Sequence, residues 1–373
     1  MAYLGENIPK LGFGLMRLPM IDGEVDIDQT KQMVDMFLNA GFTYFDTAYG
    51  YLDGKSEKAA KTALVERHPR ESFQLATKLP AWAGAKNAEE ARQMFYTSLE
   101  RTGAGYFDFY LLHNLGDTRT KAFDDYEIWD FVAELKRQGL VKHVGFSMHD
   151  SPEALEKVLQ AHPEMEFVQL QINYADWDSS SVRARECYEM ARKYDKPVII
   201  MEPVKGGSLA KLPDSVSRVF EKANPDVTLS SWALRFAASL EGLVTVLSGM
   251  SNIEQMQDNL STMQGFKPLS AEEHKVIDAA MDALNAIERI PCTQCGYCTK
   301  DCPQHINIPG IFGAMNNALV YGNETGAQGN YAFATREGGK ASDCLACGQC
   351  EAACPQHIDI IERLKTCAEK FEH

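Results

Sequence analysis

Two runs of cysteines near the end of the chain have the spacing of metal ligands. The run CTQCGYCTKDCP (292–303) returns fifty-two residues later as CLACGQCEAACP (344–355). Each reads C-x2-C-x2-C-x3-C-P, a spacing at which three thiolates bind three of the four irons of one [4Fe–4S] cluster. The fourth cysteine of each run, which precedes a proline, belongs to the cluster of the other run. The spacing therefore predicts two [4Fe–4S] clusters with crossed ligands.

The predicted ligand sets draw on both runs. One cluster takes three cysteines of the first run and the last of the second, Cys292, Cys295, Cys298 and Cys354. The other takes Cys344, Cys347, Cys350 and Cys302. Zinc is the alternative, but it prefers two CxxC or CxxH pairs per site over two four-cysteine runs closed by proline. The tail resembles a two-cluster ferredoxin domain, and the forty residues between the runs favour its helical variety.

Four side chains that can move or position a proton follow short apolar runs earlier in the chain. They are Asp46, Tyr51, Lys78 and His113. A free tyrosine, with a pKa of about 10, is a poor acid at neutral pH. A neighbouring ammonium stabilises its phenolate, a carboxylate can hold that ammonium, and an imidazole can orient a carbonyl oxygen. Each residue alone is as readily a loop cap, a solvated lysine or a packed histidine, so the prediction depends on all four converging.

The surrounding pattern supplies a place where they can converge. Eight short runs rich in Val, Ile, Phe and Leu predict strands, and amphipathic helical stretches separate them. The runs cover 11–16, 43–46, 73–78, 107–113, 141–147, 166–172, 197–201 and 243–249. Strands alternating with helices in this way predict an α/β fold, a (β/α)8 TIM barrel. The C-terminal ends of its strands form one rim, where the four side chains would meet.

The segments YFDTAYGYLDGKSE, LATKL, FYLLHN, VGFSMHD and LQINY stand in this order at the expected strand ends. With them, residues 4–262 resemble the aldo-keto reductase family. The resemblance implies a barrel that binds an extended nicotinamide dinucleotide without a Rossmann domain. It also implies Tyr51 as general acid, Lys78 and Asp46 as the pair that adjusts it, and His113 as the residue that orients the carbonyl.

The same resemblance implies contacts to the nucleotide. Ser147 and Gln171 would hold the nicotinamide carboxamide, and Met201 stands where an aromatic residue commonly stacks on the ring. The glycines of KGGSL would let backbone N–H groups approach the pyrophosphate, which runs along Lys205, Gly206, Gly207, Ser208 and Leu209. Beyond the last strand, the positions that face the adenosine end hold Gly249, Gln255 and Asn259.

Departures from the family pattern bear on the choice of cofactor. Met148 stands beside Ser147, where the family usually has Asn. The stretch SGMSNIEQMQDNL (248–260) contains no Arg or Lys, although NADP-binding members carry basic residues there. A 2′-phosphate thereby loses charge-assisted hydrogen bonds of about 1.5–3 kcal/mol each. We therefore expect NAD(H) to compete with NADP(H).

Composition restricts the partners and the compartment. The 373 residues carry a formal net charge of −15, which argues against nucleic acid or an anionic membrane surface and would suit a basic redox partner protein. The start MAYLGENIPKLGFG lacks the pattern of a signal peptide, and no apolar stretch approaches the roughly 20 residues of a membrane helix. Clustered CxxC spacing in such a chain predicts metal in a reducing cytoplasm.

Together these patterns predict three parts: a barrel over 1–265, a helical connector over 266–290 and an iron–sulfur domain over 291–373. The expected function is an oxidoreductase that reduces or oxidises a small carbonyl/alcohol pair, with clusters that transfer electrons or serve as scaffold. The alternative is an electron-transfer protein whose barrel is a docking or regulatory platform. Trp82 and Phe123, in the loops 80–87 and 114–126, are candidate walls of the substrate pocket or loop anchors.

Overall fold

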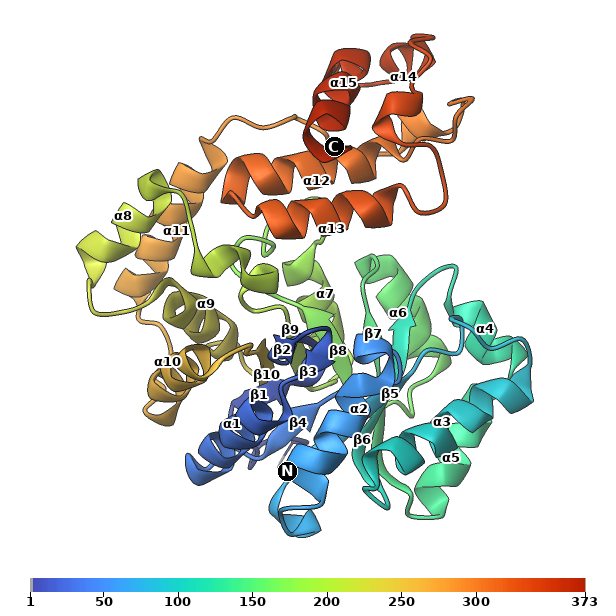
Figure 1. Ribbon diagram of the computed structural model, residues 1–373, viewed down its shortest axis with the longest axis vertical. Helices are drawn as coiled ribbons and strands as arrows, with labels where there is room; N and C mark the ends of the chain where they lie inside the picture. The colour runs from blue at the N-terminus through green and yellow to red at the C-terminus, as the bar shows by residue number, and fades with distance from the viewer. Residues whose placement is uncertain (1–2, 373) are drawn as a thin grey trace. The chain divides into compact units, whose positions relative to one another are not determined.

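A computed structural model describes residues 3–372, and within them eight parallel strands close into a barrel (Figure 1). The strands are β1 (Leu11–Gly14), β4 (Tyr44–Asp46), β5 (Gln74–Leu79), β6 (Phe107–Leu115), β7 (Val141–Met148), β8 (Val168–Gln171), β9 (Val198–Met201) and β10 (Leu243–Gly249). Each strand pairs with its neighbours along the chain, and β1 closes the ring between β10 and β4. All eight predicted strands are present, and the predicted barrel is confirmed.

Helices follow the strands and cover the outside of the barrel. They are α1 (Ile27–Asn39), α2 (Lys55–Ala60), α3 (Ala88–Thr102), α4 (Thr120–Asp125), α5 (Ile128–Arg137), α6 (Pro152–Ala161), α7 (Ala184–Lys193), α9 (Leu229–Ala238) and α10 (Ile253–Gln264). Side-chain caps start several of them. Asp26 accepts a hydrogen bond from the backbone N–H of Gln29 at α1, and Ser151 accepts one from Ala154 at α6.

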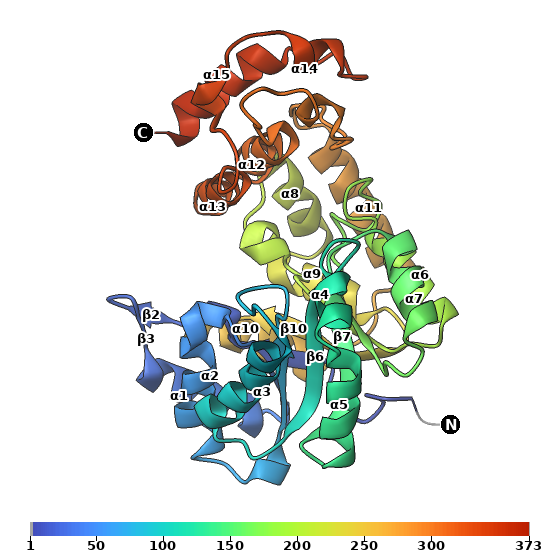
Figure 2. The ribbon, with the colours of Figure 1, turned by 90° about the vertical axis from the view of Figure 1, so that its right-hand side faces the viewer.

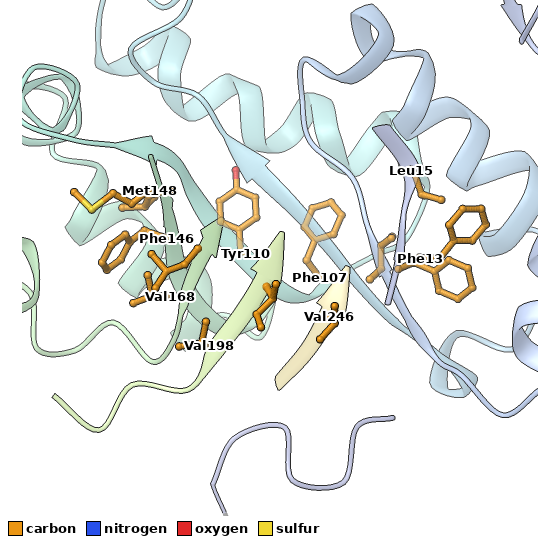
Figure 3. Packing of buried hydrophobic residues seen from close by; sticks show 14 of the residues in the cluster. Phe13, Leu15, Phe107, Tyr110, Phe146, Met148, Val168, Val198 and Val246 are labelled. Carbon is orange, nitrogen blue, oxygen red and sulfur yellow. The ribbon is translucent and has the colours of Figure 1, made fainter. Parts of the chain in front are cut away.

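The barrel is held by a core of buried apolar side chains from nearly every strand, of which Figure 3 shows a part. Phe13 of β1 packs its ring against those of Phe37 and Phe45, with centroid separations of 5.7 and 6.1 Å. Close strand packing also needs glycine. A Cβ on Gly145 of β7 would lie 2.4 Å from the carbonyl oxygen of Phe167, so a side chain there would push β7 from its neighbour.

One small element was not predicted from the sequence. β2 (Met20–Ile21) and β3 (Glu24–Val25) form an antiparallel hairpin after the first barrel strand. Met20 and Ile21 are exposed. Strands this short, with no buried face, leave no alternation of apolar and polar residues for the sequence pattern to report.

The described chain separates into two compact units. The first ends at Lys205 and resumes over Ser230–Leu269, and the second contains Gly206–Leu229 and the chain from Ser270 onward. The segment between β9 and α9, which includes α8 (Asp214–Ala223), therefore belongs with the C-terminal chain. The boundaries drawn from the sequence did not separate this segment from the barrel.

The second unit is helical. α8 packs on α11 (Ala271–Asn285), which begins at a capping box formed by Ser270 and Glu273. α12 (Ile308–Tyr321) lies beside α13 (Glu324–Ala334), and α15 (Ile360–Phe371) packs on α12 (Figure 2). α13 forms although it contains Gly326 and Gly329, which have low helix propensity. Asn323 caps it, and Ala327, Tyr331 and Ala334 bury its inner face.

The two cysteine runs share one backbone conformation. Residues fifty-two apart, Gln294 and Ala346, both adopt a left-handed backbone with φ of 58° and 53°. The same match holds for the pair Gly296 and Gly348, with φ of 75° and 78°, and for His305 and His357, with 52° and 51°. Such values are uncommon outside glycine, so their recurrence shows that the sequence repeat is also a structural repeat. Within residues 3–372, no helix is long and apolar enough to cross a membrane.

Candidate active site and cluster region

A buried ion pair lies at the C-terminal ends of β4 and β5. Lys78 Nζ donates to Asp46 Oδ1 at 2.5 Å and to the carbonyl oxygen of Thr47 at 2.8 Å. The side chains of Lys78 and Asp46 are 0% and 3% exposed. Burial acts to lower the pKa of Lys78, but the carboxylate of Asp46 and the phenol of Tyr51 outweigh it and raise that pKa above its ordinary value. Lys78 is therefore an ammonium ion at neutral pH.

Tyr51 lies over this pair in the loop after β4. Its ring centroid is 4.8 Å from Lys78 Nζ, and its ring meets that of His113 edge-on at 5.9 Å and 78°. Burial raises the pKa of Tyr51, and the nearby Lys78 lowers it by less. By itself, the ammonium of Lys78 would lower the pKa of Tyr51. The fold adds a larger opposing contribution, so the free site holds Tyr51 as a neutral phenol.

His113 comes from a distorted end of β6. The register of β6 against β7 shifts between Leu112 and Leu115, and Asn114 within this bulge has a left-handed backbone with φ of 59°. A bulge turns side chains out of the regular alternation and directs His113 toward Tyr51. Burial, followed by the charge of Lys78, lowers the pKa of His113 to about 3. The imidazole is therefore neutral, and Nδ1 is buried without a hydrogen-bond partner among residues 3–372.

The two candidate pocket walls have different surroundings. Trp82 is 38% exposed, and its Nε1 donates to the carbonyl oxygen of His113 at 2.7 Å. The guanidinium of Arg119 lies 5.0 Å from the Trp82 ring centroid. Phe123 is fully buried in the barrel core and is a packing residue, which corrects its candidacy as a pocket wall. Arg119 was not singled out from the sequence.

The residues expected at the nicotinamide end lie at neighbouring strand ends and already have partners. Ser147 Oγ accepts a hydrogen bond from the backbone N–H of Asn114 at 2.8 Å. The Gln171 amide uses both ends, with Oε1 3.2 Å from His149 Nδ1 and Nε2 donating to Asp176 Oδ2 at 2.8 Å. Met201 Sδ accepts from Gln169 at 3.3 Å. The Gln171 amide keeps one further donor and one further acceptor position, since its Nε2 has two N–H groups and its Oε1 has two lone pairs.

The segment expected to follow the pyrophosphate falls on the boundary between the two units. Lys205, in the first unit, forms an ion pair of 2.5 Å with Asp176. Gly206 and Gly207, in the second, have φ of 62° and 96°, which glycine adopts readily. Leu209 is buried, and Ser208 Oγ accepts a hydrogen bond of 2.9 Å from Asn323 Nδ2.

Arg17, which comes from a distant part of the chain, lies beside the residues expected at the adenosine end. Gln255 Oε1 accepts from the backbone N–H of Ser251, and Asn259 Nδ2 donates to Ser248 Oγ, both at 2.8 Å. A Cβ on Gly249 would lie 3.4 Å from the side chain of Arg17, in the short helix after β1. The stretch 248–260 has no basic residue of its own, but the barrel brings one to its start. The distance of Arg17 along the chain hid it from the sequence analysis.

Each cysteine run contributes to two cavities in the second unit. One cavity is lined by Cys302, Cys344, Cys347 and Cys350. The other is lined by Cys292, Cys295, Cys298 and Cys354. In both sets the fourth cysteine of one run joins the first three of the other. Apolar side chains fill much of the remaining lining, and Ile308 lines both cavities.

The chemistry of these cavities fits an iron–sulfur cluster better than a single ion. Among the residues that the structure describes, no three His, Cys, Asp or Glu side chains stand close enough to bind one metal ion. Zinc draws four ligands to about 2.0–2.3 Å from its centre, whereas a cubane cluster keeps its four thiolates at separate corners. Four cysteines around an open apolar space match the second requirement.

Comparison with known proteins agrees with both halves. Residues 10–282 match the aldo/keto reductase family, and residues 291–359 match the 4Fe-4S dicluster domain. An uncharacterized oxidoreductase of Bacillus subtilis, YqkF, is 22% identical over 302 residues, which cover 73% of this chain and 92% of that protein. An aldo-keto reductase of Mycolicibacterium smegmatis is 29% identical over 42% of this chain and 51% of its own length.

Two solved structures show the same barrel. Aldo-keto reductase AKR11C1 from Bacillus halodurans, in its holo form, aligns over 75% of this chain and 95% of its own, with a TM-score of 0.61 and 25% identity. An aldo-keto reductase from Klebsiella pneumoniae, in complex with NADPH, aligns over 74% and 95%, with a TM-score of 0.56 and 22% identity. The second likeness is one of fold alone.

Proposed function

The chain belongs to the aldo/keto reductase family and carries a 4Fe-4S dicluster domain, and from this premise we propose that it interconverts a small carbonyl compound and its alcohol with a nicotinamide dinucleotide. The observation that carries the proposal is the meeting of Asp46, Tyr51, Lys78 and His113 at one rim. They come from three strand ends and one loop, and they combine an acid, the cation that stabilises its conjugate base, and a neutral imidazole.

In the reducing direction, Tyr51 Oη gives its proton to the carbonyl oxygen of the substrate. Burial raises the pKa of Tyr51, so the phenol is fully protonated before the reaction. The phenolate that remains is stabilised by Lys78, which Asp46 holds in place. His113 stays neutral because burial lowers its pKa to about 3. Its imidazole can therefore donate a hydrogen bond that orients the carbonyl without bringing a second charge.

A reduced nicotinamide, when bound, would supply the hydride, and the residues around the rim suit such a ligand in part. Ser147 and Gln171 present polar groups at adjacent strand ends, and Gln171 keeps one donor and one acceptor position beyond its contacts with His149 and Asp176. Arg17 beside Gly249 can offer a cation to a phosphate. This position supports NADP(H) more than the sequence stretch alone does. Titration with NADH and NADPH in parallel ranks the two.

The two [4Fe–4S] clusters would be held by the crossed ligand sets. Cys292, Cys295, Cys298 and Cys354 line one cavity, and Cys302, Cys344, Cys347 and Cys350 line the other, which supports this assignment. Each cluster carries one electron, whereas a nicotinamide carries two as hydride. The clusters would therefore exchange single electrons with a redox partner protein or serve as scaffold for the second unit.

A second candidate function is an electron-transfer protein whose barrel is a docking or regulatory platform. One observation favours it: Gln171 and Ser208, both expected to bind the nucleotide, are hydrogen-bonded within the protein. Against it stands the Asp46–Lys78 pair, since two buried charges are costly to keep without a use.

The variant Tyr51→Phe separates the two candidates. Loss of the proton donor should lower kcat/KM on aldehydes by about 100-fold or more, since general acid catalysis contributes on the order of 10²–10⁴-fold. The matched control is Tyr49→Phe, which removes a hydroxyl two residues away and should keep the activity. Iron and sulfide content should be unchanged in both. If Tyr51→Phe turns over aldehydes as fast as an active wild type, the proposed acid is wrong. If the wild type itself reduces no aldehyde with either nucleotide, the platform is favoured.

A further inference from the structure

Arg119 is a half-buried cation beside the proposed catalytic histidine. It precedes α4 in the loop after β6, and a turn anchors its backbone, because the N–H groups of Arg119 and Thr120 both donate to the carbonyl oxygen of Gly116. Its guanidinium donates to Asn114 Oδ1 at 2.9 Å and lies over the Trp82 ring. Both contacts connect Arg119 to His113. Asn114 follows His113 in the chain, and Trp82 donates to the carbonyl oxygen of His113.

The charge of Arg119 is not neutralised within the protein. No carboxylate of the described chain, 3–372, lies within ion-pairing distance of its guanidinium. The acidic residues of the same loop have partners elsewhere: Asp117 with Lys157, Asp124 with Trp129, and Asp125 with Lys121. A guanidinium has five N–H donors, and Asn114 accepts from one of its nitrogens. Donors therefore remain for a group that the protein itself does not supply.

Two other cations near this rim have carboxylate partners. Lys78 is paired with Asp46, and Lys205 is paired with Asp176. His113 is neutral, and the charge of Glu202 acts on Tyr51 and His149. Among the described residues, Arg119 is therefore a cation near the proposed carbonyl position that has no carboxylate within ion-pairing distance.

We propose that Arg119, held by Asn114 and Trp82, is a carboxylate-binding subsite, and that the substrates are carbonyl compounds that also carry a carboxylate. The proposal rests on the proposed function, because it places the carbonyl beside Tyr51 and His113. A guanidinium binds a carboxylate through two parallel hydrogen bonds, which fixes orientation as well as affinity. A single carboxylate matches the single charge of one guanidinium.

Matched neutral and charged substrates test the subsite. 3-Formylbenzoate and 4-formylbenzoate are compared with 3-formylbenzamide and 4-formylbenzamide, which have the same shape without the charge. For at least one spacing, the wild type should show a kcat/KM about tenfold or more higher for the acid than for the amide, the ratio that about 1.4 kcal/mol produces. Arg119→Gln should bring this ratio close to one by lowering kcat/KM for the acid, while kcat/KM for the amide stays the same. Arg119→Lys should keep part of the preference for the acid.

The control is Lys121→Gln. Lys121 is exposed in α4, two residues from Arg119, and its loss changes the net charge by the same amount. It should leave the ratio unchanged, because the proposed effect is direct contact rather than attraction at a distance. A ratio lowered equally by Lys121→Gln and Arg119→Gln would overturn the subsite. An active wild type that reduces the acid and the amide of each pair with equal kcat/KM would also overturn it.

A binding measurement separates failure of the subsite from failure of the proposed function. Titration calorimetry with benzoate and benzamide needs no turnover. Tighter binding of benzoate that disappears in Arg119→Gln supports the subsite even in a chain that reduces no aldehyde. Equal binding of both ligands to the wild type and to Arg119→Gln contradicts it, whether or not aldehydes are reduced.

Discussion

Removing cysteines in pairs tests the crossed ligand sets, because crossed and uncrossed arrangements predict opposite results. Cys302→Ala with Cys344→Ala removes two of the four cysteines of one cavity and none of the other. This chain should keep one complete cluster, about four irons instead of about eight. Cys292→Ala with Cys302→Ala removes one cysteine from each cavity and should leave no complete cluster, although both changes lie in one run.

The assay is made on anaerobically reconstituted protein. Iron and acid-labile sulfide give the total, and electron paramagnetic resonance after reduction counts the intact [4Fe–4S] centres. The resonance signal is needed because a cavity with three cysteines can retain an incomplete cluster. The first double variant should show one intact centre per chain and the second none. The control Cys187→Ala replaces a buried cysteine of the barrel and should keep both intact centres.

Uncrossed ligand sets would reverse this pattern. If each run held its own cluster, the Cys292 and Cys302 double variant would keep one intact centre, since both changes would damage the same cluster. The Cys302 and Cys344 double variant would then keep none. That outcome would refute the assignment of ligands from the cavity linings.

Two further predictions concern the buried groups of the barrel rim. Asp46→Asn leaves the fully buried ammonium of Lys78 without its carboxylate and should cost about 3–5 kcal/mol of unfolding free energy, measured by urea denaturation followed by tryptophan fluorescence. Adding Lys78→Met should recover much of that loss, and a cost below about 1 kcal/mol for Asp46→Asn alone would contradict the burial of the pair. The second prediction follows from His113, whose folded-state pKa of about 3 lies below the ordinary value of 6.5. The unfolded chain binds this proton as pH falls below 6.5 and the folded chain does not, so its contribution to stability is complete above that pH and is lost toward pH 3. Between pH 7 and 5 the wild type should lose about 2 kcal/mol more than His113→Leu, and parallel losses in the two proteins would show that the imidazole titrates normally.

Local pattern was enough to predict the barrel strands and the cysteine cavities. The eight strands are apolar runs with turns between them, and this information is contained in each segment. The spacing within the two cysteine runs likewise predicts which thiolates share a cavity, and the cavity linings have the same sets. Local pattern is a poor guide to the helix α13, because Gly326 and Gly329 have low helix propensity. Packing of Ala327 and Tyr331 outweighs that preference.

By itself, the sequence determined which groups are available at the rim, because each strand end is set by its own residues and parallel strands bring these ends together. Only the tertiary structure decided their states and neighbours. The depth of burial keeps Tyr51 protonated and His113 neutral, and burial is a property of the whole barrel. Arg17 beside Gly249 and Arg119 beside Trp82 are contacts between segments far apart in the chain, which no local pattern encodes. The charges that would choose a cofactor and a substrate are therefore placed by the fold.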